Sequence, residues 1–171
     1  MTAEELQHLL DIMDDGILRK GAHTAGEAEF CALEFESQVR GRDWSDKPLT
    51  LPDLRPLNDA NWSSDKTRTA GLLPVMSALW DYSTWSFVRR RQWLDYVVIQ
   101  TTCRIVAEIP FFVRAGKEKP IITTLKEAKR WATDAARAAA GAAAGAAEVD
   151  SILLLACKIW IDGVKATEDV V

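Results

Sequence analysis

Histidine is scarce in this chain, and its scarcity restricts the chemistry that the protein can perform. Only His8 and His23 occur among the 171 residues. Imidazole is the commonest acid–base catalyst and a common metal ligand. His23 could approach Glu27 and Glu34 near a helix start, but no H-x-x-x-H or E-x-x-H pair accompanies these three residues. We therefore predict no metal site and no cofactor.

A catalytic nucleophile in a recognisable setting is also missing. Cys31 and His23, with several carboxylates, invite comparison with a hydrolase. Such an enzyme needs a base within hydrogen-bond reach of its nucleophile and a pair of oxyanion donors. No serine or cysteine here lies in the strained turn of a nucleophile elbow. We predict that the protein is not an enzyme, and we keep hydrolysis as an alternative.

The chain has few cysteines and no long apolar run. Cys31, Cys103 and Cys157 all fall in expected helices and form no C-x-x-C pair, which predicts packed thiols in a reducing compartment. The most apolar run, residues 152–157, is far too short to cross a bilayer. No basic segment followed by an apolar run opens the chain, so no signal peptide is expected. We expect a cytoplasmic protein with no membrane partner.

Charge is unevenly distributed along the sequence. The net charge of −4 argues against general nucleic-acid binding. Residues 1–66 hold seven Lys/Arg against fourteen Asp/Glu, whereas residues 84–137 hold eleven Lys/Arg against five Asp/Glu. The acidic first third and the basic centre either pair with each other inside the fold or build a cleft of mixed charge, and both interpretations stay open.

Helix signals, in contrast, are abundant. Three capping boxes begin at Thr2, Thr24 and Thr124, each with a glutamate three residues later. No segment alternates apolar and polar residues over the length of a strand. These patterns predict an all-α fold, a bundle of five or six helices in a single domain over residues 1–171. The expected helices span residues 2–16, 24–40, 65–82 with a bend at Pro74, 84–108 and 124–166.

The last expected helix is long and rich in alanine. Apolar residues recur at steps of three and four along it, and Gly141 and Gly145 lie one turn apart in its alanine stretch, which favours close helix packing. Roughly forty helical residues make a rod of about 60 Å, whereas a compact chain of this length has a radius of gyration of about 15–16 Å. The rod therefore either breaks near Gly145 or is covered by another subunit. We favour a homo-oligomer that packs through this Ala/Gly seam.

Residues 41–64 form the one long irregular segment of the expected fold. The segment holds three of the six prolines together with Trp44 and Trp62, whose large side chains seldom lie on a solvated linker. Irregular segments of this length in compact domains are either functional or disordered, and the tryptophans argue against disorder. We predict a long, ordered and packed loop with a functional role.

The loop and its neighbours hold the kinds of side chain that a nucleotide requires. An arginine forks a phosphate, an aspartate or asparagine accepts ribose hydroxyls or a base edge, and a tryptophan stacks on a base. The amides at the helix start near Ser63 to Asp65 add a candidate anion site. The alternative is a loop pinned by its own Arg–Asp pairs. The candidate ligand-binding residues are His23, Glu34, Trp44, Asp46, Arg55, Asn58, Asp59, Trp62, Asp65 and Arg68.

A second candidate stretch mixes aromatic and basic residues from Trp80 to Tyr96. On a helix Trp85, Arg89 and Trp93 share one face, where arginine stems can pack over buried rings. The sharper alternative is that Arg89 and Arg90 contact a phosphate of the ligand. The same helix could instead bind a protein partner, so the stretch has three open interpretations.

Several of these segments also form a pattern together: GAHT at 21–24, CALE at 31–34, WSDKP at 44–48, RPLNDA at 55–60, Trp62, Arg68–Thr69 and the alanine-rich terminal helix. In this pattern the chain resembles a family of uncharacterised small proteins from phages and bacteria. Small phage proteins without catalytic machinery include sponges that sequester the nucleotide messengers of bacterial immunity. The resemblance therefore implies a phage anti-defence protein that holds a nucleotide in the host cytoplasm. The alanine-rich rod is also similar to bacterial immunity proteins, which implies a protein-binding inhibitor as the first alternative, with a nucleotide hydrolase as the second.

We predict that replacing both Gly141 and Gly145 by leucine separates the helices that meet at the seam, because overpacking a close contact costs about 1–3 kcal/mol per site. If the seam joins subunits, light scattering should show a smaller species that is still helical by circular dichroism. If the seam lies within one subunit, the melting temperature should fall at unchanged mass. A wild-type protein that is monomeric at micromolar concentration would contradict the intersubunit seam.

Overall fold

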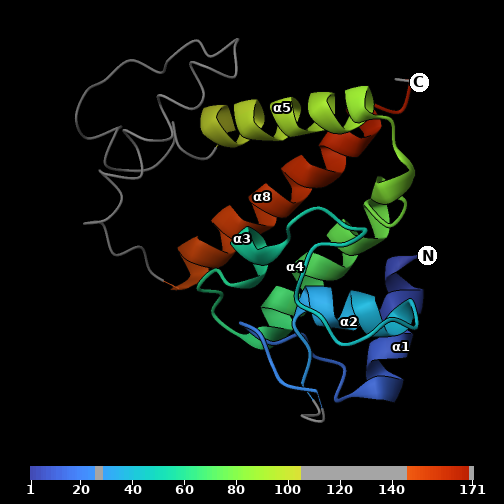
Figure 1. Cartoon of the computed structure of the whole chain (residues 1–171). Coiled ribbons are helices and arrows are strands. Elements are labelled where there is room, and N and C mark those ends of the chain that lie inside the picture. Colours follow the sequence, from blue (N-terminus) through green and yellow to red (C-terminus); the bar gives the residue numbers. More distant parts are fainter. Residues whose placement is uncertain (26–28, 105–145, 170–171) are drawn as a thin grey trace. The chain divides into compact units, whose positions relative to one another are not determined.

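Helices account for most of the secondary structure that the structure describes. The structure is a computed structural model and describes residues 1–25, 29–104 and 146–169. One isolated parallel bridge pairs Leu18 with Phe30, and no strand forms within these ranges, so the all-α prediction is confirmed. The helices, labelled as in Figure 1, are α1 (Ala3–Met13), α2 (Ala32–Val39), α3 (Arg55–Asn58), α4 (Asp65–Ala78), the 3-10 helix η1 (Tyr82–Thr84), α5 (Phe87–Arg104) and α8 (Ala146–Ala166).

The chain divides into two compact units, which we describe separately. The first unit consists of Met1–Trp85 and Ala146–Ile161, and the second consists of Ser86–Gly145 and Asp162–Val171. Helix α8 therefore contributes residues to both units. The Thr124 capping box and the predicted seam at Gly141 and Gly145 lie outside the described residues.

Helix α1 begins where its capping box predicts. Thr2 Oγ1 accepts the amide of Glu5 at 3.1 Å, and a carboxylate oxygen of Glu5 accepts the amide of Thr2 at 2.8 Å. Leu6 and Leu10 are fully buried, and the helix packs against α4. Gly16 follows the helix with a φ of +80°, a conformation that favours glycine.

The second helix is much shorter than the sequence predicts. Helix α2 begins at Ala32 rather than at Thr24. The segment before it is held by the side chain of Glu34, which accepts the backbone amides of His23 and Cys31. These amides are thereby satisfied without a helix, so side-chain contacts override the capping signature at Thr24.

Helix α2 is the most deeply buried element of the first unit. Every residue from Cys31 to Ser37 is buried, including the two carboxylates of Glu34 and Glu36. The loop that follows crosses back over the helix, because Ser37 Oγ donates to the carbonyl of Ser45 at 3.1 Å. In Figure 1 this loop is the teal segment beside α2.

The loop over residues 41–64 is ordered and packed, as predicted. Its side chains Leu51, Leu54, Leu57 and Trp62 are buried, and it contains the short helix α3. The indole Nε1 of Trp62 donates to the carbonyl of Leu57 at 2.8 Å. The loop is therefore anchored to the core by apolar side chains along its second half.

The N-terminus of α4 is closed by residues of the chain itself. Ser64 Oγ accepts the amide of Thr67 at 3.2 Å. Asp150 of α8 accepts the amide of Ser63 at 2.8 Å and also the hydroxyl of the same serine, and these bonds lower the pKa of Asp150. The predicted anion site at this helix start is thus occupied by a carboxylate of α8, whereas the sequence suggested Asp65 as the competitor.

The ends of the next two helices also differ from the prediction. Helix α4 contains Pro74 but ends at Ala78, so the chain leaves the helix before Tyr82. Helix α5 begins at Phe87 rather than near Thr84. Ends of helices depend on local capping geometry, which sequence patterns locate only to within a few residues.

In the second unit, α5 lies close to the end of α8. A Cβ on Gly163 would be 3.0 Å from ring atoms of both Trp93 and Tyr96, so glycine permits this approach. Arg104 Nη1 lies 3.7 Å from a carboxylate oxygen of Asp162. Trp93 is 2% exposed, which makes it the main apolar anchor of this helix pair.

We predict that Gly71→Ala in α4 lowers the free energy of unfolding. A Cβ at Gly71 would lie 2.6 Å from Cη2 of Trp62, whose ring is buried and hydrogen-bonded. Alanine gains about 1 kcal/mol of helix propensity over glycine, but overpacking costs typically 1–3 kcal/mol, so the clash should prevail. Chemical denaturation measures the net loss.

The neighbouring exposed residue Ala70 supplies the control. Ala70→Gly should lose only the propensity difference of about 1 kcal/mol. In a Trp62→Leu background the penalty of Gly71→Ala should shrink, because the ring atom that the new methyl meets is gone. Equal penalties in both backgrounds would contradict the contact.

Candidate functional site

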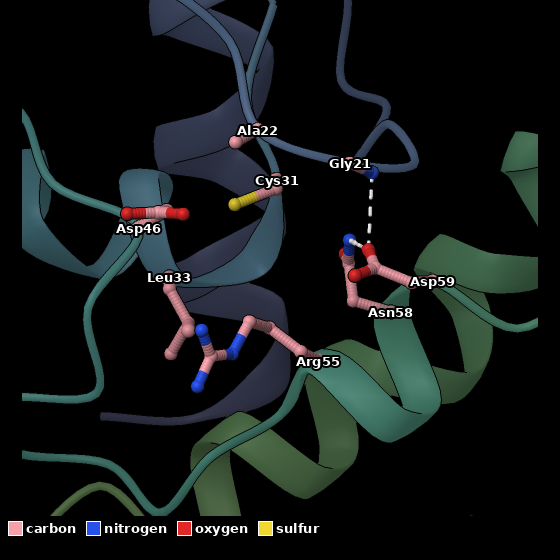
Figure 2. Close-up of a pocket in the computed structure, with 8 residues that line it drawn as sticks. All are labelled: Gly21, Ala22, Cys31, Leu33, Asp46, Arg55, Asn58 and Asp59. Atoms are coloured by element: carbon pink, nitrogen blue, oxygen red, sulfur yellow. Dashed lines mark hydrogen bonds between the residues drawn. The ribbon is translucent and has the colours of Figure 1, made fainter.

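A small cavity beside the first residues of α2 is lined by several of the predicted ligand-binding residues. Its volume is about 40 Å³. This is room for about one or two water molecules, far below the roughly 300–1,000 Å³ of ligand pockets. Figure 2 shows the lining residues: Gly21, Ala22, Cys31, Leu33, Asp46, Arg55, Asn58 and Asp59.

Arg55 presents its guanidinium group at this cavity. In Figure 2 its side chain extends from the start of α3 toward Leu33. Its Nε and Nη2 donate to the two carboxylate oxygens of Asp53, at 2.8 and 2.7 Å, in the bidentate fork that arginine forms with carboxylates and phosphates. These hydrogen bonds lower the pKa of Asp53 and raise the pKa of Arg55. The fork is close to half exposed on both sides, so a ligand can reach it.

Asn58 and Asp59 connect α3 to the turn before α2. Asp59 Oδ1 accepts the amide of Gly21 at 3.0 Å and Nδ2 of Asn58 at 2.8 Å. Asn58 Oδ1 accepts the amide of Ala32 at 3.2 Å. Asn58 is 2% exposed, so it positions the first turn of α2, whereas Asp59 is exposed and stays open to solvent.

His23 and Glu34 bind each other and shape the same turn. Glu34 is fully buried. Its Oε1 accepts the amide of His23 at 2.6 Å, and its Oε2 lies 2.9 Å from His23 Nδ1 and accepts the amide of Cys31 at 2.8 Å. The carbonyl of His23 in turn accepts Nε1 of Trp44 at 2.9 Å. Glu34 therefore positions the site and offers no surface to a ligand.

Three further residues that the sequence suggested for ligand binding, Trp62, Arg68 and Asp65, hold the loop in place instead. Trp62 is 7% exposed and Arg68 is 3% exposed. Arg68 Nε donates to the carbonyl of Asn58 at 2.9 Å, and its Nη1 pairs with Asp65. Asp65 also pairs with Arg19, at 3.3 Å. The expectation that Trp62 stacks on a base is corrected, because its ring packs in the core, and the alternative of a loop pinned by Arg–Asp pairs describes Arg68 and Asp65.

Trp44 lines a second feature of the first unit, an open groove of about 560 Å³. Its ring stacks on Phe30 with centroids 5.0 Å apart and an interplanar angle of 30°. Arg42 also lines the groove, and its Nη1 donates to Thr50 Oγ1 at 3.3 Å. The remaining lining residues are Gly41, Asp43, Ser45 and Leu49.

Arg42 lines the groove but was not among the candidates from the sequence, whereas Asp53 belongs to the polar loop segment that suggested a ligand and pairs with Arg55. For Asp53 a signal exists, since an aspartate can accept the backbone amide two residues later. Its Oδ1 accepts the amide of Arg55 at 3.1 Å. Arg42 follows a helix end at Gly41 and carries no such pattern, so its place in a groove depends on the tertiary fold.

Arg89 and Arg90 lie on α5 and belong to the second unit, whereas the residues that line the cavity belong to the first unit. Both are partly buried. Trp85, which the sequence places on one helical face with Arg89 and Trp93, precedes α5 and belongs to the first unit. The aromatic and basic stretch is therefore divided between the two units.

The thiol of Cys31 lines the cavity but is poorly suited to act as a nucleophile. Burial raises its pKa to about 12, so the group stays protonated near neutral pH, and the thiolate is the reactive form. Burial likewise raises the pKa of Cys157 to about 12. None of the three cysteines forms a disulfide.

Metal binding and membrane insertion find no support in the described part of the chain. No group of three or more His, Cys, Asp or Glu side chains in it is arranged to hold a metal ion. None of its helices combines the length and apolar character needed to cross a bilayer.

Comparisons with models of protein families, with curated proteins and with solved structures of other proteins give no match. The likeness to phage and bacterial proteins therefore stays a prediction from the sequence. The cavity at Arg55 and the groove at Trp44 have to be interpreted from their own chemistry.

Proposed function

We propose that the protein binds and holds a small nucleotide-type ligand, without converting it, at the surface formed by the Arg55 cavity and the Trp44 groove. The observation that carries this proposal is the exposed fork between Arg55 and Asp53. Two parallel guanidinium donors match a phosphate as well as they match a carboxylate. A phosphate of the ligand can therefore replace Asp53 without any rearrangement of the core.

The volumes favour the groove as the position of most of such a ligand. The cavity of about 40 Å³ admits no more than a single small group, whereas the groove of about 560 Å³ falls in the range of ligand pockets. Ser45 lines the groove and Asp46 lines the cavity, and consecutive Cα atoms are about 3.8 Å apart. A ligand as long as a nucleotide can thus reach both, with its base on the indole of Trp44.

The carboxylates of Asp46 and Asp59 favour a particular kind of nucleotide. An ionised carboxylate only accepts hydrogen bonds, so these groups suit sugar hydroxyls or the amino groups of a base. They also repel additional phosphate charge in their neighbourhood. One arginine fork among carboxylates therefore fits a ligand with a single phosphate charge near Arg55 better than it fits a triphosphate.

Sequestration is favoured over hydrolysis by the state of the cavity thiol. The pKa of Cys31, raised to about 12, keeps the thiol protonated and unreactive near neutral pH. Together with the resemblance to small phage proteins, this supports a sponge for a nucleotide messenger of bacterial defence, with a nucleotide hydrolase as the weaker alternative.

A different observation favours binding of a protein partner, as in an immunity or inhibitor protein. Phe87, at the start of α5, is 82% exposed and is followed by three arginines within four residues. Exposed aromatic side chains beside arginines are typical of the surfaces at which proteins bind each other. This is the second candidate function.

Native mass spectrometry distinguishes these functions directly. The protein is purified from cells that produce defence nucleotides, and its bound molecules are then released by heating. An intact nucleotide supports sequestration, a cleaved nucleotide indicates a hydrolase, and a bound protein indicates the second candidate. A protein that carries no nucleotide and binds none from a panel by calorimetry would overturn the proposal.

We predict that Arg55→Ala weakens binding of the co-purifying nucleotide about five- to a hundredfold, because the variant loses a charge-assisted bidentate contact. Asp53→Asn should act in the opposite direction and strengthen binding, because it removes the negative charge that competes for Arg55. Isothermal titration calorimetry measures both changes.

Lys66→Ala, at an exposed position of α4, is the control for the loss of one positive charge, and its affinity should stay that of the wild type. All three variants should keep the wild-type melting temperature, since exposed ion pairs contribute little to stability. Unchanged affinity in both Arg55→Ala and Asp53→Asn would show that the ligand binds elsewhere.

A further inference from the structure

One face of α1 is acidic and carries an exposed apolar side chain. Residues 1–18 contain five carboxylates and no lysine or arginine. One side of the helix is formed by residues spaced three or four positions apart, Glu4, His8 and Asp11, together with the adjacent Ile12. All four are exposed, and Ile12 is 67% exposed. Leu6 and Leu10 are buried on the opposite side.

One face of α5 has the complementary character. Phe87, Arg91 and Leu94 lie at steps of four and three on one side of the helix. Phe87 is 82% exposed and Leu94 is 46% exposed, and Arg91 is exposed as well, beside Asp95 at 3.2 Å. Trp93 and Val97 are buried on another side of the same helix. Helix α5 as a whole holds four arginines and one aspartate.

We propose that these two faces bind each other between copies of the chain, with α1 of one copy packing on α5 of a second copy. Ile12 lies between Phe87 and Leu94 in this contact, and Arg91 meets the carboxylates of Glu4 and Asp11. The apolar residues leave water, and the charges fix the orientation of the two helices. This association is independent of the nucleotide site and of the predicted Ala/Gly seam.

Charge complementarity is what selects a second copy as the partner. The two faces carry opposite charge, and each exposes apolar side chains. Two α1 faces or two α5 faces repel each other, whereas an α1 face attracts an α5 face. Both faces are short, which predicts an interface at the small end of specific contacts and hence a weak association. Exposed charges dominate it, so it should weaken with salt.

The association is tested by sedimentation equilibrium of the full chain at about 0.1 M and about 1 M salt, between which the Debye length falls from about 10 Å to about 3 Å. The wild type should associate more strongly at the lower salt. Arg91→Glu and Glu4→Arg should each weaken association about five- to tenfold. Phe87→Ser should weaken it to a similar degree at both salt concentrations.

Restoration of the charge pair provides the decisive comparison. A mixture of Arg91→Glu with Glu4→Arg should form mixed complexes, because one variant then supplies two acidic faces and the other supplies two basic faces. Lys66→Glu, with the same change of charge at an exposed site on α4, should associate like the wild type. Circular dichroism confirms that each variant is folded.

Several outcomes would overturn the proposal. The first is a wild type that stays monomeric at low salt and high concentration. The second is association that Arg91→Glu and Phe87→Ser both leave unchanged. If the Gly141→Leu, Gly145→Leu variant then loses this association, the Ala/Gly seam is the interface instead. The third is a foreign protein that binds the α5 face while the free chain shows no self-association.

Discussion

The buried carboxylate of Glu34 is the contact on which the first unit depends. Removing a carboxylate from water costs several kcal/mol, and the donors that offset this cost come from His23 and Cys31. Both donors precede α2, so the same contact decides where the helix begins and what shape the preceding turn takes. That turn supplies one wall of the cavity, with Gly21 and Ala22. The site is thus set by a group that no ligand touches.

Polar side chains of the loop have two distinct roles. Asn58 and Arg68 lie in the interior, where an unpaired polar group would be costly, and their hydrogen bonds tie the loop to α2 and α4. Arg55 and Asp59 lie at the surface, where they keep contact with water. The interior set makes the loop rigid without a disulfide or a metal, and a rigid loop can hold an exposed arginine ready for a ligand with little loss of entropy on binding.

The sequence predicts the features of this fold that depend on neighbours in the chain. The start of α1 follows from Thr2 and Glu5, and the order of the loop follows from its tryptophans and prolines. The start of α2 could not be predicted, because Glu34 reaches back eleven residues to His23 and competes with a local capping signal. Sequence also could not separate Trp62 from Trp44, or Arg68 from Arg55. Trp62 is buried because Gly71 leaves room for its ring, and Arg68 is buried because the carbonyl of Asn58 accepts its Nε. Both contacts are set by the tertiary fold.

The contact between Asp150 and Ser63 also has a consequence for how the chain folds during synthesis. Asp150 lies 87 residues after the serine whose amide it accepts. A ribosome that adds about 5–20 residues per second needs roughly 4 to 17 seconds for that interval. Until then the amide of Ser63 lacks this acceptor, and Cys157 and Ile159, which are buried in the folded chain, have not yet been made. The first unit is therefore completed only when nearly the whole chain has been made, although most of its residues are made first.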